Sequence, residues 1–192
     1  CKEITNSFKH ITITISISID DIEENHDKIR EIDGLFDNCI KSYKSIENLK
    51  NVEPVVVITV SHDNYKNVKD LYKELVETYN ISSIKAGIVR NEGVYKIPLE
   101  HKKNILDSYV WLSNKIQSDS EKNKLNTYNK KTIQGRLHYS KDLKTYNYVK
   151  NNYMNPKYVS DCPAGKLFGI IDAKGDVYAC EILENDKIGS LR

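Results

Sequence analysis

Two cysteines near the C-terminal end of the sequence are placed to act together. Cys162 and Cys180 lie 18 residues apart, with Gly175 between them. The runs 167–171 and 176–180 flank this glycine, which predicts a β-hairpin with Gly175 in its turn. Two thiolates held near each other by such a hairpin could ligate a metal ion or an iron–sulfur cluster. A disulfide or two buried thiols is the alternative that the residues leave open.

A second group of polar residues comes at or just after the ends of three β-branched runs. Ligands of parallel βα barrels lie at the C-terminal ends of the strands. A hydroxyl and an amide can hold polar groups of a ligand there, and an arginine can pair with a carboxylate. Loop or helix capping is the alternative for each, especially for Asp20 beside Asp21. The four candidates are Ser18, Asp20, Asn64 and Arg90.

Strands and helices must alternate along the chain to position these residues. Apolar residues follow a period of two in the predicted strands and steps of three and four in the predicted helices. Three strand–helix repeats predict parallel strands joined by right-handed crossovers. The strands are expected at 11–19, 55–60 and 84–89, and the helices at 35–49, 64–79 and 99–116.

The first predicted strand alternates isoleucine with threonine or serine from Ile11 to Ile19. Buried parallel strands are usually apolar on both faces, so one face of small hydroxyls needs an explanation. A barrel wall provides one, with isoleucines outward against helices and hydroxyls inward. An antiparallel strand with its hydroxyl face in water is the alternative.

Composition excludes several classes of protein. The chain has 192 residues, a net charge of +2, 39% hydrophobic and 29% charged residues, which indicates a globular protein. The balanced charge argues against a nucleic-acid partner, and no apolar run is long enough for a transmembrane helix. No signal peptide is visible, so we expect a cytoplasmic protein without a membrane partner.

The stretch 118–158 interrupts the strand–helix pattern. Residues 118–131 are rich in Lys, Asn, Ser and Glu and are expected to form an exposed loop. The tyrosines that follow could stack on bases, but the balanced net charge favours packing onto a neighbouring domain instead. We therefore expect three regions: a barrel part at 1–117, a polar linker or insertion at 118–158, and a hairpin domain at 159–192.

Several motifs resemble those of radical SAM enzymes with a SPASM/twitch extension. Twelve residues separate Cys162 from Gly175 and four separate Gly175 from Cys180, as at the start of that extension. The final segment, Lys187-Ile-Gly-Ser-Leu-Arg192, is similar to the family's GN(L/I)R segment with Ser190 in place of Asn. Upstream, similar family motifs are matched by Ile17-Ser-Ile-Asp20, by His26-Asp27 with Arg30, by Val60-Ser-His-Asp-Asn64 and by Ile88-Val-Arg90.

The resemblance implies an α/β fold: the C-terminal half of a partial (β/α)6 TIM-like barrel, followed by a β-hairpin of a SPASM/twitch domain. It implies that Ser18, Asp20, Asn64 and Arg90 line a cavity for S-adenosylmethionine. Cys162 and Cys180 would be metal ligands of an auxiliary [4Fe–4S] cluster, completed by residues beyond Arg192. Glu181 would be an acid or base on the substrate side, and the substrate would be a peptide or protein.

One departure from the family concerns its N-terminal CxxxCxxC motif, which binds the catalytic [4Fe–4S] cluster. This sequence lacks it, because its only cysteines are Cys1, Cys39, Cys162 and Cys180. We therefore expect a fragment of a radical SAM enzyme, inactive alone, whose N- and C-terminal parts are missing. The alternative is a non-catalytic α/β binding module with a zinc-binding or metal-free cysteine hairpin.

Overall fold

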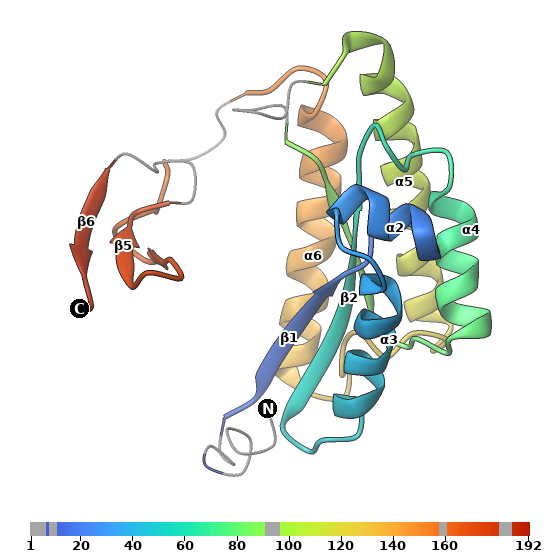
Figure 1. The fold of residues 1–192 in the computed structure, drawn as a ribbon, viewed down its shortest axis with the longest axis horizontal. Coiled ribbons are helices and arrows are strands. Elements are labelled where there is room, and N and C mark those ends of the chain that lie inside the picture. Colours follow the sequence, from blue (N-terminus) through green and yellow to red (C-terminus); the bar gives the residue numbers. More distant parts are fainter. Residues whose placement is uncertain (1–6, 8–10, 91–96, 158–160, 181–185) are drawn as a thin grey trace. The chain divides into compact units, whose positions relative to one another are not determined.

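The computed structural model describes residues 7, 11–90, 97–157, 161–180 and 186–192. The chain divides into two compact units, Cys1–Asn155 and Pro156–Arg192 (Figure 1). Among the described helices, none is both long enough and apolar enough to cross a membrane.

Three parallel strands form the sheet of the first unit. They are β1 (Ile13–Ser18), β2 (Val52–Val60) and β3 (Ile84–Ile88), in the spatial order β1-β2-β3. In the register of the sheet, Ser18 pairs with Val57 of β2, and Thr59 of β2 pairs with Gly87 of β3. The three predicted strands and their parallel pairing are confirmed.

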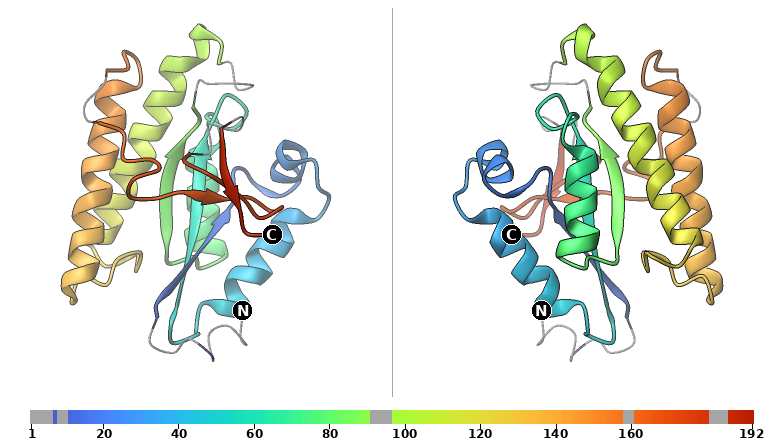
Figure 2. Two further views of the ribbon diagram at one scale, coloured as in Figure 1. Left: turned by 90° about the vertical axis from the view of Figure 1, so that its left-hand side faces the viewer. Right: turned by 90° about the vertical axis from the view of Figure 1, so that its right-hand side faces the viewer.

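Helices pack on one face of this sheet (Figures 1 and 2). The core lies between that face and the helices, with Val56, Ile58 and Val60 of β2 fully buried against Leu71 and Ile105. A short helix at 23–30 was not predicted, and the first turn of the helix expected at 64–79 is absent. The helices are α2 (Glu23–Arg30), α3 (Leu35–Ile46), α4 (Val68–Lys73) with a π-helical turn η1 (Glu74–Thr78), and α5 (Leu99–Glu121).

The two faces of β1 differ as the alternation of its residues predicts. The isoleucines of β1 are half-buried, and Ile17 packs against the core. The hydroxyl residues Thr14, Ser16 and Ser18 are exposed on the opposite face. Among the described residues of the first unit, no helix covers that hydroxyl face.

The exposed loop predicted at 118–131 is wrong. Residues 118–121 form the last turn of α5, and Leu125 and Tyr128 are buried in the core of the first unit. The expected linker stretch also contains a long helix, α6 (Ile133–Asn152), which belongs to the first unit and runs beside α5 (Figure 2). Its fully buried residues are Gly135, Asp142 and Tyr146, and Val149 is the aliphatic residue of α6 that packs against the core, so the sequence shows only a weak apolar helical period.

Hydroxyl groups from α6 and from residues just before and just after it bond to β3 and to the residue that follows it. The Ile84 N–H donates to Thr127 Oγ1 at 3.1 Å, and the Ala86 N–H donates to Tyr146 Oη at 3.3 Å. The Tyr153 hydroxyl donates to the Val89 carbonyl at 3.2 Å. These bonds satisfy backbone groups that an edge strand otherwise leaves open for pairing.

The second unit contains a small antiparallel sheet. Its strands are β4 (Ile170–Ile171), β5 (Asp176–Tyr178) and β6 (Lys187–Ser190), in the order β4-β5-β6. Asp172 Oδ1 accepts hydrogen bonds from the N–H groups of Lys174 and Asp176, and Gly175 has a φ of +85°. β4 and β5 therefore pair antiparallel with Gly175 in the turn between them, whereas β6 was not predicted.

Candidate functional site

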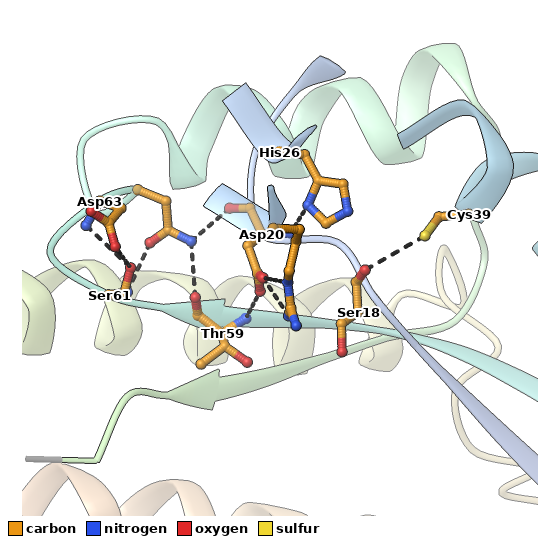
Figure 3. Close-up of polar contacts among 9 residues, drawn as sticks. Ser18, Asp20, His26, Cys39, Thr59, Ser61 and Asp63 are labelled. Atoms are coloured by element: carbon orange, nitrogen blue, oxygen red, sulfur yellow. Dashed lines mark hydrogen bonds and ion pairs between the residues drawn. The ribbon is translucent and has the colours of Figure 1, made fainter. Parts of the chain in front are cut away.

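The C-terminal ends of the three parallel strands lie at one edge of the sheet (Figure 3). Ser18 is the last residue of β1, and Asp20 follows it after one residue. Asn64 lies in the loop after β2, and Arg90 follows β3. The structure therefore brings the four predicted residues to the same edge of the sheet.

Asp20 is buried, and both of its carboxylate oxygens have partners within the chain. Arg30 holds Oδ2 through Nε at 2.7 Å and through Nη2 at 2.5 Å. The Thr59 N–H donates to Oδ1 at 3.3 Å, which ties the carboxylate to β2. A buried carboxylate that is fully paired in this way holds the loop after β1 in place.

His26 fixes the same loop from the other side. Its Nδ1 accepts a hydrogen bond from the Asp20 N–H at 3.1 Å, so the ring is neutral and its proton is on Nε2. The side chain is fully buried, and this burial lowers the pKa of His26 below its usual value. The Nε2 atom has no hydrogen-bond partner among the described residues, and the ring meets the Phe36 ring edge-on. The interpretation that His26 and Arg30 fix the loop after the strand is confirmed.

Asn64 joins the ends of β1 and β2. Its Nδ2 donates to the Asp20 carbonyl at 2.6 Å and to the Thr59 carbonyl at 2.8 Å. Its Oδ1 accepts from the Ser61 N–H at 2.8 Å. The Asn64 side chain is fully buried, so its amide positions the strand ends and is not offered to a ligand.

Ser18 is the predicted residue of β1 whose side chain faces outward. Its carbonyl accepts a weak hydrogen bond from Cys39 Sγ at 3.8 Å, and its hydroxyl points away from Cys39 and His26 (Figure 3). The alternation of side chains places Thr59 and Gly87 on the same face, which the helices leave open. A Cβ atom at Gly87 would lie 3.2 Å from Thr59 Oγ1. Because Gly87 has no side chain, the backbone beside Thr59 is left uncovered on this face.

Sequence reasoning missed Thr59 and Gly87 as residues of this edge. Their positions follow from the strand register, in which Thr59 and Gly87 are paired, and the register depends on contacts distant in sequence. The available signal was the alternation along each strand, which places Thr59 two residues after Val57 on the same face. Arg90 is exposed at the end of β3.

The two predicted metal ligands belong to the second unit. Cys162 is exposed and Cys180 is half-buried, and both are free thiols. A Cβ atom at Gly165 would lie 3.2 Å from the Cβ atom of Ala179, so the segment after Cys162 packs beside the residue before Cys180. No group of three or more His, Cys, Asp or Glu residues suited to a metal occurs among the described residues. Glu181 lies outside the described residues.

Comparison with known proteins gives a likeness of fold. No family model matches the chain, and no curated protein matches it. It is similar to a solved structure of hexahistidine-tagged anSMEcpe with bound AdoMet, with a TM-score of 0.54 and 14% identity. The match covers 92% of this chain and 45% of that chain, so this chain spans less than half of its neighbour's length. The comparison therefore shows a likeness of fold to part of that structure, in keeping with a mixed α/β fold that contains a parallel three-stranded sheet.

Proposed function

We propose that this chain is part of a radical SAM enzyme that binds S-adenosylmethionine at the C-terminal edge of its parallel sheet and modifies a peptide or protein. The observation that carries the proposal is the shared fold with anSMEcpe, an anaerobic sulfatase-maturating radical SAM enzyme. The sequence motifs of the same family support it independently. In this proposal the sheet is the C-terminal half of a partial (β/α)6 barrel.

The residues at the sheet edge fit a small polar ligand. The Ser18 and Thr59 side chains and the bare backbone at Gly87 form a low, polar surface on the face that the helices leave open. Hydroxyls of this kind suit the ribose or the amino acid part of AdoMet, and Arg90 suits its carboxylate. Bound AdoMet would supply the 5′-deoxyadenosyl group from which the family's radical is made.

Asp20 and Asn64 have a positioning role in this proposal. The Asp20–Arg30 ion pair and the Asn64 amide hold the ends of β1 and β2 in register. They thereby hold the end of β1, which carries the Ser18 hydroxyl that is offered to the ligand. Rigid support of this kind is what a precise binding site needs.

The proposal assigns Cys162 and Cys180 as two ligands of an auxiliary [4Fe–4S] cluster. Such clusters usually have four cysteine ligands, and the described residues supply two. Further ligands, and the CxxxCxxC motif that the family's reaction needs, would come from outside this sequence. Glu181, next to Cys180, is proposed as an acid or base on the substrate side.

The proposed AdoMet site can be tested on the 192-residue chain itself. AdoMet is added to the isotope-labelled chain, and the backbone amide signals are followed by NMR. We expect the signals of 18–20, 59–64 and 87–90 to shift, because these residues form the C-terminal edge of the sheet. Ser18→Ala should weaken AdoMet binding about five-fold, which corresponds to the loss of one hydrogen bond.

Ser16→Ala is the matched control for this experiment. Ser16 is an exposed hydroxyl on the same face of β1, two residues before the edge. Its replacement should leave AdoMet binding unchanged. Shifts at the N-terminal ends of the strands, or equal AdoMet affinity of the Ser18→Ala chain, would reject the proposed site.

A further inference from the structure

Positive charge is concentrated in one stretch of this nearly neutral chain. Residues 122–157 contain nine Lys and Arg and one acidic residue, a formal net charge of +8, whereas the whole chain carries +2. That acidic residue, Asp142, is buried and bonded to Lys85 at 2.8 Å and to Lys141 at 3.2 Å. Glu121 and Asp119, just before the stretch, lie near Lys122, Lys124 and Lys130, whereas the cations of α6 other than Lys141 form no ion pair with a described residue.

The stretch includes α6, whose outer side is open. Gly135, Asp142 and Tyr146 face the protein, since they are the buried residues of this helix. On the opposite side lie Ile133, Leu137 and Tyr148, whose exposed fractions are 69%, 63% and 46%. The steps from Ile133 to Leu137, Lys144 and Tyr148 keep these residues in one stripe along a helix with 3.6 residues per turn.

Unpaired cations accompany this stripe. Lys144 lies in the stripe and Arg136 lies beside it; both are exposed and have no ion-pair partner among the described residues. Two adjacent aliphatic side chains with cations around them form a surface that complements an acidic segment with aliphatic residues. Polar rims and apolar centres of this kind are common in protein interfaces.

We infer that the outer face of α6, formed by Ile133, Leu137, Lys144 and Tyr148 with Arg136 beside them, docks an acidic peptide segment that carries aliphatic side chains. The inference rests on this face alone and goes beyond the proposed function. Single-stranded nucleic acid fits less well, because stacking needs several open rings and Tyr146 is buried. A membrane surface fits less well, because two aliphatic residues give little apolar area for insertion.

Fluorescence anisotropy with the 192-residue chain can test this inference. The probe is a fluorescein-labelled peptide with the repeat Glu-Leu-Glu-Ser. Three comparisons use the same peptide with Ser in place of Leu, a single-stranded RNA of equal charge, and vesicles containing phosphatidylserine. We expect the Leu-containing peptide to bind most tightly, and its affinity to fall as salt is added.

Two variants separate the charge from the apolar contact. Arg136→Gln together with Lys144→Gln should lower the affinity for the Leu-containing peptide about five-fold, as expected for two exposed ion pairs. Leu137→Ser should lower it about five-fold as well, but should leave binding of the Leu-free peptide unchanged. Unchanged far-ultraviolet circular dichroism and thermal melting would show that both variants are folded.

Lys41→Gln together with Lys73→Gln is the matched control, because it removes two exposed charges from α3 and α4. This control variant should bind the peptide as the parent chain does. Equal loss in both double variants would show a general charge effect and overturn the inference. Tighter binding of the RNA or of the vesicles than of the peptide would overturn it as well.

Discussion

Replacing Asn64 with alanine should loosen the C-terminal ends of β1 and β2 without changing the hydrophobic core. The Asn64 amide is fully buried and makes three hydrogen bonds, to the Asp20 carbonyl, the Thr59 carbonyl and the Ser61 N–H, at 2.6, 2.8 and 2.8 Å. Each bond contributes about 1 kcal/mol, and a buried group left without a partner costs about 1–3 kcal/mol. We therefore expect Asn64→Ala to lower the free energy of unfolding by about 3 kcal/mol.

The loss can be measured by chemical denaturation and by thermal melting. For a unit of this size, about 3 kcal/mol corresponds to a decrease in Tm of roughly 10 °C. Asn67→Ala is the control, since the Asn67 amide donates one hydrogen bond, to Asp21 Oδ2 at 2.9 Å, and should cost about 1 kcal/mol.

A second variant, Asn64→Asp, tests the direction of the bonds. It keeps an acceptor for the Ser61 N–H but places an oxygen against the carbonyls of Asp20 and Thr59. We expect it to be at least as destabilising as Asn64→Ala. If Asn64→Ala lowered stability no more than Asn67→Ala does, the idea that Asn64 holds the two strand ends together would be refuted.

Two further predictions concern His26 and the cysteines. Burial lowers the pKa of His26 below 6.5, so the unfolded chain binds this proton more readily. The free energy of unfolding should therefore be unaffected by His26 protonation above about pH 6.5 and should decrease as the pH falls below this value. His26→Asn keeps an acceptor for the Asp20 N–H and removes the titrating group. In urea denaturation between about pH 7 and 5, this variant should show a weaker pH dependence of the free energy of unfolding. In a protein that contains this chain and the family's cluster motif, Cys180→Ala should lower the iron content after reconstitution by about one cluster. An iron content equal to that of the parent protein would remove Cys180 from the ligands.

The sheet could be predicted from the sequence because its signals are local. The alternation from Ile11 to Ile19 and the apolar run at 55–60 are visible without any tertiary contact, and the intervening helices favour parallel pairing. The helix α6 could not be predicted in this way. Its buried side depends on Asp142 and Tyr146, whose partners Lys85 and Ala86 lie far away in sequence.

For the site, the sequence located the residues but not their roles. Positions at the ends of strands predicted Ser18, Asp20 and Asn64 at one edge, which the structure confirms. Whether Asp20 faces a ligand or the protein depends on Arg30 and on the Thr59 N–H, and only the folded chain brings these groups together. Residue type alone therefore could not distinguish Asp20, which holds the ends of the strands together, from Ser18, whose hydroxyl faces outward at the same edge.

The two edges of the sheet differ, and this difference predicts how the chain behaves in solution. Hydroxyls of Thr127 and Tyr146 close the outer edge of β3, whereas no strand among the described residues pairs with the outer edge of β1. The Ile13 N–H donates to the carbonyl of Asn51, the residue before β2, and the Ile19 N–H donates to the Val57 carbonyl. Because N–H groups alternate in direction along a strand, the odd-numbered residues of β1 face β2 and the Ser16 N–H points outward. An open edge of this kind pairs with other chains, and we expect self-association that grows with concentration in light scattering.

Ser16→Pro should reduce this association while keeping the bonds between β1 and β2, because proline removes one outward donor. Ser16→Ala keeps that donor and should associate like the parent chain; a monomeric parent chain at high concentration, or equal association of both variants, would show that the β1 edge is not the contact.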